Sequence, residues 1–460
     1  MPPAPPAPAP VAALHAMGCR LNHAEAARVR GALEAAGWTV RDGASPAGAD
    51  AFLLHTCAVT GAAQAEALRR LRAARRAGVP RIVVSGCVAN VADAAVLRRA
   101  GATDVVSRHD PPRDPATGDP PLAALVAAAL RGGVPAAALS FGATRAPVKV
   151  QDGCSFRCAY CIVPDARGEP RSRPLPDVLE ECRALVARGF RELVLTGVNV
   201  ACWRDGPRTF SDLVHAVAAL PGLARVRMSS VEPRTTEREV VDLLAEPGGR
   251  LCRTLHYPLQ SGSDRILRAM RRRYTAAEYR AAVEYALARV PALGLGADVI
   301  AGFPGETDED FEETLRLVRD YPFSNLHVFP YSERPGTPAA TMPGAVPVRV
   351  RRERARALVA LGEEKRAAFA ASFAGREADV LVERVDPDGT ASGWSGEYLR
   401  VRIPGRAPAD AGALLRVRIA RAEGDVLLAA PETEIAGPSP LFGATPSRRP
   451  ANRAFAPLRK

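Results

Sequence analysis

The sequence lacks long apolar runs and an export signal. No stretch of about 18 or more consecutive apolar residues occurs in it, which excludes an ordinary membrane-spanning helix. The first ten residues, MPPAPPAPAP, lack the basic start and the leucine-rich middle of a secretory signal. We therefore expect a protein of the cytoplasm that does not contact a membrane.

The sequence also lacks the paired cysteines of a disulfide framework. Its nine cysteines are an odd number spread over 460 residues, whereas disulfide-rich domains are short and carry even numbers. Free thiols persist in a reducing compartment, which agrees with the cytoplasm. The net charge of +12 comes mainly from arginine and suits contacts with phosphate, but charge by itself does not decide between nucleic acid and other partners.

A fourth cysteine is missing from the densest cysteine group in the chain. Cys154, Cys158 and Cys161 follow a short apolar run in the segment QDGCSFRCAYCIVPDARG. Three thiolates leave one iron of a 4Fe-4S cluster open, and an open iron can bind a substrate or cofactor rather than only carry electrons. A zinc knuckle is the alternative, but no second pair of ligands with zinc spacing follows in the sequence.

The N-terminal third alternates short apolar runs with helical patterns. The runs VAALHAM (11–17), AFLLHT (51–56) and RIVVSG (81–86) are each followed by a helical stretch, which predicts a parallel sheet. Asn22, with Glu25 three residues on, predicts a capping-box start for the first of these helices.

Each of these three runs leads into a cysteine, namely Cys19, Cys57 and Cys87. The carboxyl ends of parallel strands lie at one edge of a sheet, where ligands bind. We therefore predict that the three thiolates form a second cluster site. Three small buried apolar cysteines are the alternative.

The centre of the chain repeats the strand-helix alternation after a linker rich in Pro, Gly and Ala. Helical patterns separate the strand candidates, and repeats of this length predict a full or partial barrel. The six strand candidates are 148–151, 192–196, 226–230, 254–257, 297–301 and 326–329. A basic helical segment (348–374) then leads into short strand-like runs with turn residues between them, which predict a small OB-like β-barrel.

The fold class predicted is thus α/β, with a Rossmann-like parallel-sheet domain, a central partial (β/α)6 barrel and a small antiparallel β-barrel. The predicted segments are a disordered leader (1–10), the N-terminal domain (11–125), a linker (126–143), the central domain (144–372), the small β-barrel (373–432) and a basic disordered tail (433–460).

Polar and glycine-rich segments follow four of the central strands. They read TGVN (196–199), SSVEP (229–233), HYPLQSGSD (256–264) and DVIAGFPGET (298–307). Active sites of βα-barrels form at the carboxyl ends of the strands, so these segments suit a cofactor with amino, carboxyl and nucleoside parts. Turn formation alone is the alternative for each segment.

The cysteine motifs resemble a known family. CSFRCAYC resembles the signature of radical S-adenosylmethionine (SAM) enzymes, and its order after MGCRLNHAE, HTCAVT and SGCVAN closely resembles the methylthiotransferases over about residues 12–432. The C-terminal region is similar to the family's TRAM RNA-binding domain. SSVEP, HYPLQSGSDRILRAMRRRYT and DVIAGFPGETDEDFEET are most similar to the branch that modifies N6-threonylcarbamoyladenosine at position 37 of tRNA, beside the anticodon.

This resemblance implies the cofactors and their ligands. Cys154, Cys158 and Cys161 would hold a 4Fe-4S cluster whose open iron binds SAM, and electron transfer would cleave SAM to a 5′-deoxyadenosyl radical. Cys19, Cys57 and Cys87 would hold an auxiliary 4Fe-4S cluster that presents sulfur. The residues implied for the SAM pocket are Tyr160, Thr196, Gly197, Val198, Asn199, Ser229, Glu232 and Gln260.

The resemblance also implies the reaction and the partners. The radical would remove hydrogen from C2 of the adenine, and a methylated sulfur would be added there, with a second SAM as methyl donor. An aromatic C–H offers no acidic proton to a general base, which agrees with a radical route. The partners implied are tRNA and a reducing electron donor of the flavodoxin or ferredoxin type, and we expect a monomer.

Several residues depart from the family pattern or from any ligand spacing. His23 and His55 stand where the family has Gln and Asn, and are either iron ligands or hydrogen-bonded spacers. Asp165 replaces a commoner Tyr in a loop that would contact the substrate. Of the three remaining cysteines, Cys182 is predicted to be core, and the other two, Cys202 and Cys252, are unassigned.

Three other functions stay open. They are a methylthiotransferase for isopentenyl-adenosine tRNA, a methylthiotransferase for an aspartate of a ribosomal protein, and a non-catalytic iron-sulfur protein that binds RNA. The open coordination in both cysteine groups argues against the last of these.

Overall fold

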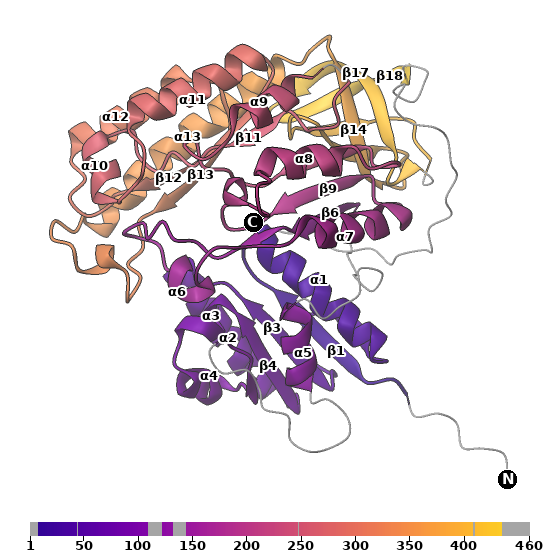
Figure 1. The fold of residues 1–460 in the computed structure, drawn as a ribbon, viewed down its shortest axis with the longest axis vertical. Coiled ribbons are helices and arrows are strands. Elements are labelled where there is room, and N and C mark those ends of the chain that lie inside the picture. The colour runs from indigo at the N-terminus through magenta and orange to yellow at the C-terminus, as the bar shows by residue number, and fades with distance from the viewer. Residues whose placement is uncertain are drawn as a thin grey trace. The chain divides into compact units, whose positions relative to one another are not determined.

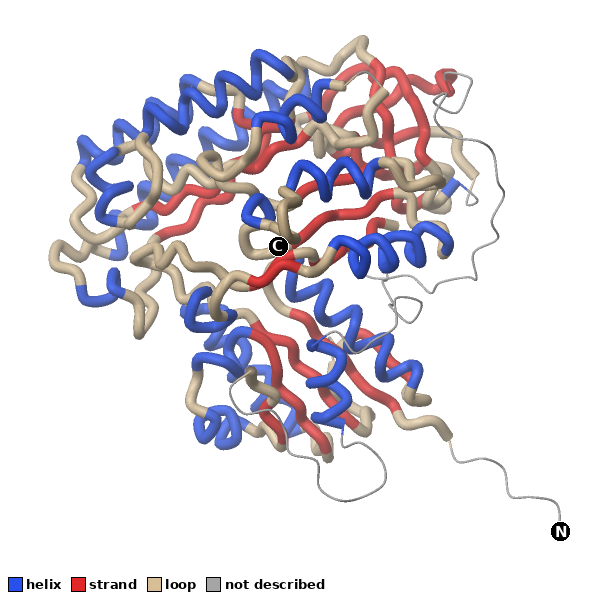
Figure 2. Tube along the Cα trace, in the orientation of Figure 1, coloured by secondary structure: helices blue, strands red, loops and turns tan. Residues whose placement is uncertain are grey.

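The computed structural model describes residues 8–43, 45–108, 122–131, 144–246, 248–407 and 410–434. The chain forms two compact units, each of which alternates strands and helices (Figures 1 and 2). The first unit comprises Met1–Phe141, Gly153–Ser155 and Cys161–Glu169, and the second comprises Gly142–Asp152, Phe156–Tyr160 and Pro170–Lys460. Most of the leader, linker and tail expected from the sequence lies outside the described residues, and the domain boundaries stay a prediction.

The first unit contains a five-stranded parallel sheet. Its strands, in spatial order, are β2 (Thr39–Asp42), β1 (Val11–Ala16), β3 (Ala51–Thr56), β4 (Arg81–Gly86) and β5 (Asp104–Val105). Its helices are α1 (Arg20–Ala35), α2 (Gly61–Arg76), α3 (Cys87–Val91), α4 (Ala94–Ala100), α5 (Leu122–Arg131) and α6 (Val163–Arg167). The three strands predicted from the sequence are confirmed, and the two short edge strands were not predicted.

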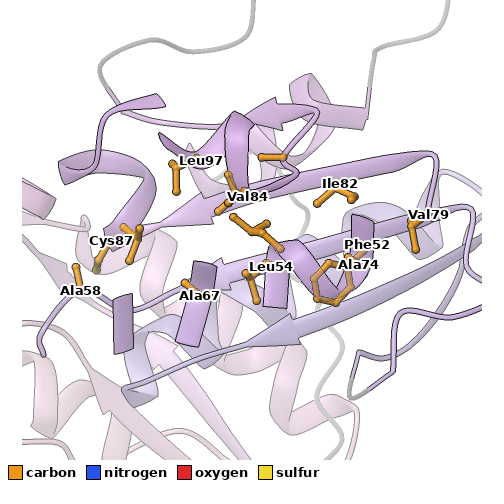
Figure 3. Close-up of a cluster of buried hydrophobic side chains, with 14 of the residues drawn as sticks. Phe52, Leu54, Ala58, Ala67, Ala74, Val79, Ile82, Val84, Cys87 and Leu97 are labelled. Carbon is orange, nitrogen blue, oxygen red and sulfur yellow. The ribbon is translucent and has the colours of Figure 1, made fainter. Parts of the chain in front are cut away.

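Apolar side chains from β3, β4 and α2 form the core of this unit. Figure 3 shows Phe52, Leu54 and Val84 of the sheet gathered with Ala67 and Ala74 of α2. All six residues of β3 are buried, as expected for a parallel strand that is covered on both faces. The small alanines let α2 approach the sheet closely enough to exclude water from the larger side chains.

The predicted capping box at Asn22 is wrong. Helix α1 begins earlier, with Cys19 in extended conformation at its N-cap position, so that Asn22 and Glu25 lie inside the helix, at 0% and 6% exposure. The Nδ2 group of Asn22 donates to the carbonyl oxygens of Met17 and Thr56, both at 2.8 Å. The side chain thus bonds to loop backbone across the sheet edge rather than to its own helix end.

The second unit contains the partial barrel that the sequence predicted. It has two three-stranded parallel sheets, and the strands of the first precede those of the second in sequence. An isolated bridge pairs Val226 of the first sheet with Leu251, just before the second sheet begins. The strands are β6 (Arg145–Lys149), β9 (Glu192–Thr196), β10 (Arg225–Met228), β11 (Thr254–His256), β12 (Gly294–Ala301) and β13 (Phe323–Pro330). All six correspond to predicted strands.

Helices follow the strands of this barrel, as Figure 1 shows. They are α7 (Leu175–Ala187), α8 (Phe210–Ala218), α9 (Arg238–Ala245), α10 (Asp264–Ala269), α11 (Ala276–Arg289) and α12 (Asp308–Asp320). A two-stranded ribbon, β7 (Gln151–Asp152) with β8 (Arg171–Ser172), and two 3-10 turns, η2 (Val200–Cys202) and η3 (Pro338–Thr341), complete this part.

A long helix and a closed five-stranded barrel end the described chain. The helix α13 (Val348–Ala371) precedes the strands β14 (Glu377–Val385), β15 (Ala391–Ser395), β16 (Arg400–Ile403), β17 (Leu414–Glu423) and β18 (Val426–Glu434). The strand β15 was not predicted. On β16, Arg400 and Arg402 are exposed while Val401 and Ile403 are buried, so this strand has one basic face. On β17, Arg416 pairs with an aspartate of β14, so part of this basic face is neutralised.

The turn after β15 packs against the beginnings of the strands of the partial barrel. Arg225, the first residue of β10, donates to the carbonyl oxygen of Trp394 at 2.8 Å, and Arg227 donates to that of Ser395 at 3.0 Å. Both guanidinium groups also bond to Glu192, at 2.6 and 2.8 Å. Burial would raise the pKa of Glu192, but the two cations outweigh burial and hold it well below its usual range. The small barrel therefore closes the amino ends of the strands and leaves their carboxyl ends to the polar segments.

Gly294, the first residue of β12, tests this packing. A Cβ at this position would collide with the backbone of Glu397, whereas a Cβ on Gly396 in the same turn would meet nothing within 4 Å. We expect Gly294→Ala to lower the free energy of unfolding by about 1–3 kcal/mol, because overpacking forces the backbone apart. Gly396→Ala should change it by less than about 0.5 kcal/mol. Equal effects in denaturant unfolding would show that the turn does not pack there.

Candidate active site

Three cysteines of the first unit follow the carboxyl ends of three neighbouring strands. Cys19 is exposed at the start of α1, Cys57 follows β3 at 7% exposure, and Cys87 begins α3 at 5% exposure. A Cβ on Gly18 would lie 2.7 Å from the Sγ atom of Cys57, and the φ of Gly18 is +88°. Only glycine lets the first cysteine loop come this close to the second. The structure thus places all three on one sheet edge, as expected, while their role as ligands stays a prediction.

His55 lies next to this edge and is fully engaged. Its Nε2 atom is 3.0 Å from Oε2 of Glu25, and its Nδ1 atom is 2.9 Å from Oγ of Ser85. The ring is 1% exposed. With both ring nitrogens bonded to other side chains, His55 is a hydrogen-bonded spacer rather than an iron ligand. Burial lowers the pKa of the neighbouring His23, so the neutral form is favoured there.

A buried arginine, which the sequence analysis missed, completes this network. The Nη1 and Nη2 atoms of Arg167 donate to the two carboxylate oxygens of Glu25, both at 3.0 Å, and Nη2 also donates to Oδ1 of Asn22 at 2.5 Å. The side chain is 7% exposed. Burial raises the pKa of Cys87 to about 11, and Arg167 opposes that shift. A cation is thus available where thiolates would have to form.

Arg167 reaches this position because the segment after Cys161 packs in the first unit. Ile162, just before α6, and Ala166 within it belong to the core of that unit, and the carbonyl oxygen of Ala166 accepts from Nδ2 of Asn90 at 2.8 Å. The sequence offered one signal for such an arginine, namely Glu25. A carboxylate between alanines in a helix that packs on a sheet needs a buried partner. Asp165, by contrast, is exposed in the first turn of α6.

The cysteine-rich loop contributes residues to both units. Cys154 and Cys161 lie in segments grouped with the first unit, and the backbone N–H of Cys154 donates to the carbonyl oxygen of Gly168 at 3.0 Å. Cys158 and Tyr160 belong to the second unit, where the N–H of Ala159 donates to the carbonyl oxygen of Met270 at 2.9 Å.

A second buried arginine lies beside Cys158. The Nη1 atom of Arg272 is 3.3 Å from the sulfur of Cys158 and 3.5 Å from the hydroxyl of Tyr160. Its Nη2 atom donates to Oε2 of Glu232 at 2.5 Å. The Arg272 side chain is 3% exposed, and neighbouring Tyr160, Tyr274 and Glu232 outweigh burial to raise its pKa. Glu232, predicted to line the SAM pocket, is thus held by a cation that the sequence analysis did not single out.

The TGVN segment after β9 is held by Gln151. The Oε1 atom of Gln151 accepts from the backbone N–H groups of Val198, at 3.0 Å, and Asn199, at 2.9 Å. A Cβ on Gly197 would lie 2.8 Å from the carbonyl oxygen of Gln151, so a larger residue would displace the segment. Thr196, at 1% exposure, ends the strand.

Polar side chains at these strand ends lack partners within the described part of the chain. Both amide atoms of Asn199 and the hydroxyl of Ser229 are buried without a hydrogen bond. Gln260 has a φ of +64°, and its backbone N–H and carbonyl groups both bond to β12. Buried polar groups are rarely left unpaired unless a ligand satisfies them. These atoms therefore fit the amino, carboxylate and ribose groups of a nucleoside cofactor.

The remaining cysteines take no part in these arrangements. Cys182 is 0% exposed on α7, which confirms its predicted place in the core, and Cys252 is 4% exposed. Burial raises the pKa of Cys202 above that of a free thiol. None of the described helices is long and apolar enough to cross a bilayer.

Two families match this chain, and together they cover most of the described residues. Residues 148–318 match the Radical SAM superfamily, and residues 12–107 match a family described as "Uncharacterized protein family UPF0004". The methyltransferase TsrM from Kitasatospora setae, solved with cobalamin and a 4Fe-4S cluster, shares the fold with a TM-score of 0.51 at 16% identity, over 72% of this chain and 76% of TsrM.

Two curated relatives match along nearly the whole chain. The threonylcarbamoyladenosine tRNA methylthiotransferase MtaB of Bacillus subtilis is 31% identical over 430 residues, which are 89% of this chain and 94% of the relative. The tRNA-2-methylthio-N(6)-dimethylallyladenosine synthase of Sorangium cellulosum is 37% identical over 457 residues, which are 88% of this chain and 90% of the relative. The radical SAM match implies a 4Fe-4S cluster and SAM as cofactors. The chain belongs to the radical SAM methylthiotransferase family and is a transferase.

Proposed function

We propose that this protein is a tRNA methylthiotransferase that converts N6-threonylcarbamoyladenosine at position 37 to its 2-methylthio derivative. The observation that carries the proposal is the pair of cysteine groups, each beside a buried Arg–Glu ion pair. The name of the relative from Bacillus subtilis includes threonylcarbamoyladenosine, whereas the name of the one from Sorangium cellulosum includes 2-methylthio-N(6)-dimethylallyladenosine. The SSVEP and DVIAGFPGET segments favour the first of these substrates.

The chemistry fits the residues that this chain provides. Cys154, Cys158 and Cys161 would hold a 4Fe-4S cluster, which with bound SAM would supply the radical that an unactivated C–H bond requires. Arg272 holds a positive charge beside Cys158 and keeps Glu232 in place. The unpaired side chains of Asn199 and Ser229 would bind polar groups of SAM.

Cys19, Cys57 and Cys87 would hold a second 4Fe-4S cluster. Their position at one sheet edge supports this role, and so does the cation of Arg167, because three neighbouring thiolates repel one another unless positive charge compensates them. A flavodoxin- or ferredoxin-type protein would supply electrons, and the protein would work in the cytoplasm as a monomer. An RNA-binding protein without catalysis would need neither compensated cysteine group.

Nucleoside analysis of a deletion strain tests the function. We expect 2-methylthio-N6-threonylcarbamoyladenosine to disappear from its bulk tRNA and to return with the wild-type gene. Cys57→Ala and Cys158→Ala should not restore it, because each removes a cluster ligand. Cys202→Ala, which removes a cysteine outside both groups, is the control and should restore it. Persistence of the modified nucleoside in the deletion strain would refute the substrate assignment.

Arg272→Gln tests the cation beside Cys158. We expect it to lower stability by about 3 kcal/mol, because Glu232 keeps a buried charge without a partner. The reduction potential of the adjoining cluster should fall, and SAM cleavage should slow at least tenfold, roughly the effect of one lost charge interaction. The double variant Arg272→Gln/Glu232→Gln should recover stability but not the potential. Recovery of both, measured by unfolding and by EPR-monitored titration, would show a purely structural role.

The exposed arginines of β16 test tRNA binding by the small barrel. We expect Arg400→Gln/Arg402→Gln to weaken tRNA binding and to reduce the slope of log K against log salt by about 1–2, since each phosphate contact releases about one counterion. Arg421→Gln is the control, because this arginine is already paired with Glu423. An unchanged slope in the double variant would place the tRNA contact elsewhere.

A further inference from the structure

A cluster of two histidines and an aspartate lies on the second half of the partial barrel. His256 ends β11, Asp298 lies in β12, and His327 lies in β13. Asp298 and His327 are register partners, so their side chains point to the same face of the sheet. The opposite face of β13 packs on α13, where a Cβ on Gly362 would lie 3.1 Å from Leu326. His327 therefore points away from α13, toward the inner face of the barrel.

One carboxylate oxygen organises the cluster. The Oδ1 atom of Asp298 is 3.1 Å from Nε2 of His256 and 3.2 Å from Nδ1 of His327. Burial would raise the pKa of Asp298, but the two imidazoles outweigh burial and hold it well below its usual range. The exposed fraction rises from 17% at His256 to 53% at His327. The cluster thus has a fixed anion at its base and an imidazole open to solvent.

A chain of hydrogen bonds continues from this cluster. The Nε2 atom of His327 is 2.9 Å from Nδ2 of Asn325, and Oδ1 of Asn325 accepts from Arg366 at 3.2 Å. Since Asp298 can only accept, Nδ1 of His327 carries the proton and Nε2 accepts from Asn325. Both nitrogens of His327 are then engaged. This assignment disfavours a metal ion, although the three ligand atoms lie within 4.8 Å of one another.

Of the three side chains, His256 is the one that can form a further hydrogen bond. Its Nε2 atom is buried 3.1 Å from Oδ1 of Asp298 and makes no other polar contact in the described part of the chain. Gly296 makes room for the ring, since a Cβ there would lie 2.6 Å from Nδ1 of His256. An unsatisfied buried nitrogen beside an open imidazole is a site for a polar ligand.

Two of the cofactor candidates, Asn199 and Ser229, lie in the other half of the barrel, while Gln260 follows β11 beside the cluster. Asn199 and Ser229 follow β9 and β10, whereas the cluster lies on β11, β12 and β13. Phe329, two residues beyond His327 on the same face, is 42% exposed. An exposed aromatic ring beside hydrogen-bonding groups suits a nucleobase that carries a polar substituent.

We propose that His256, Asp298 and His327 bind the polar N6 substituent of the substrate adenine and select threonylcarbamoyl over dimethylallyl. The proposal rests on the proposed function. The carboxylate, hydroxyl and urea groups of threonylcarbamoyl can bond to Nε2 of His256, and the exposed ring of His327 can exchange its bond with Asn325 for one to the substituent. A dimethylallyl group would cover these side chains without bonding to them, and sites built to hydrogen-bond a substrate reject an apolar analogue strongly.

The test measures kcat/KM of the reconstituted holoenzyme on two anticodon stem-loop RNAs, one with N6-threonylcarbamoyladenosine and one with N6-dimethylallyladenosine. We expect His327→Leu and Asp298→Asn each to lower the ratio of the two values at least tenfold, a scale typical of a lost specific hydrogen bond, with the loss mainly in KM. His215→Leu, at an exposed position on α8, should leave the ratio unchanged. SAM cleavage without RNA and the EPR signals of the clusters should be unchanged in all three variants.

The outcomes separate this proposal from the proposed function. A wild-type enzyme that acts only on the dimethylallyl RNA would refute both. A wild-type enzyme that acts on the threonylcarbamoyl RNA, with an unchanged ratio in His327→Leu and Asp298→Asn, would overturn only the selective role. One zinc per chain in the holoenzyme, lost in Asp298→Asn while iron is retained, would make the cluster a metal centre and would also overturn the proposal.

Discussion

A buried guanidinium near the cysteines is the feature that the two cysteine groups share, and the proposed cluster sites depend on it. Burial raises the pKa of Cys87 to about 11, so a cysteine in such a place stays a neutral thiol unless positive charge is near. Arg167, which follows Cys161 in the cysteine-rich segment, and Arg272, which lies far from it in sequence, provide that charge, and Glu25 and Glu232 hold them. A buried cation without its carboxylate would be strongly destabilising. Each arginine therefore couples thiolate chemistry to the folding of its own unit.

The two ends of the partial barrel have different roles: the amino ends of its strands pack on the small barrel, and the carboxyl ends carry the candidate site. At the amino ends of the strands, Arg225 and Arg227 bond to Glu192 and to the backbone of the small barrel. At the carboxyl ends, the side-chain polar atoms of Asn199 and Ser229 have no hydrogen-bond partner among the residues that the structure describes. All strands of a βα-barrel run the same way, so a closing domain at one end leaves the other end free for ligands.

The strands and helices were largely predictable because their patterns are local. The strand 192–196 coincides with its predicted range, since the run of apolar residues and the flanking turns set it. The short strands β2, β5 and β15 have weak patterns and form by pairing with neighbours. The capping box at Asn22 failed because backbone groups across the sheet edge compete for its amide. Local propensity gives way where tertiary partners are available.

The candidate site divides in the same way. By itself the sequence determined two groups of three cysteines at strand ends and four polar segments behind the central strands, because chain order and strand direction fix which loops share an edge. Only the tertiary structure decided which charged residues serve them. Arg272 lies between Arg271 and Arg273 in a run of three arginines that the sequence cannot distinguish, and packing buries its side chain against Cys158. His256, Asp298 and His327 come together for the same reason: register across three strands is a property of the folded sheet rather than of any one segment.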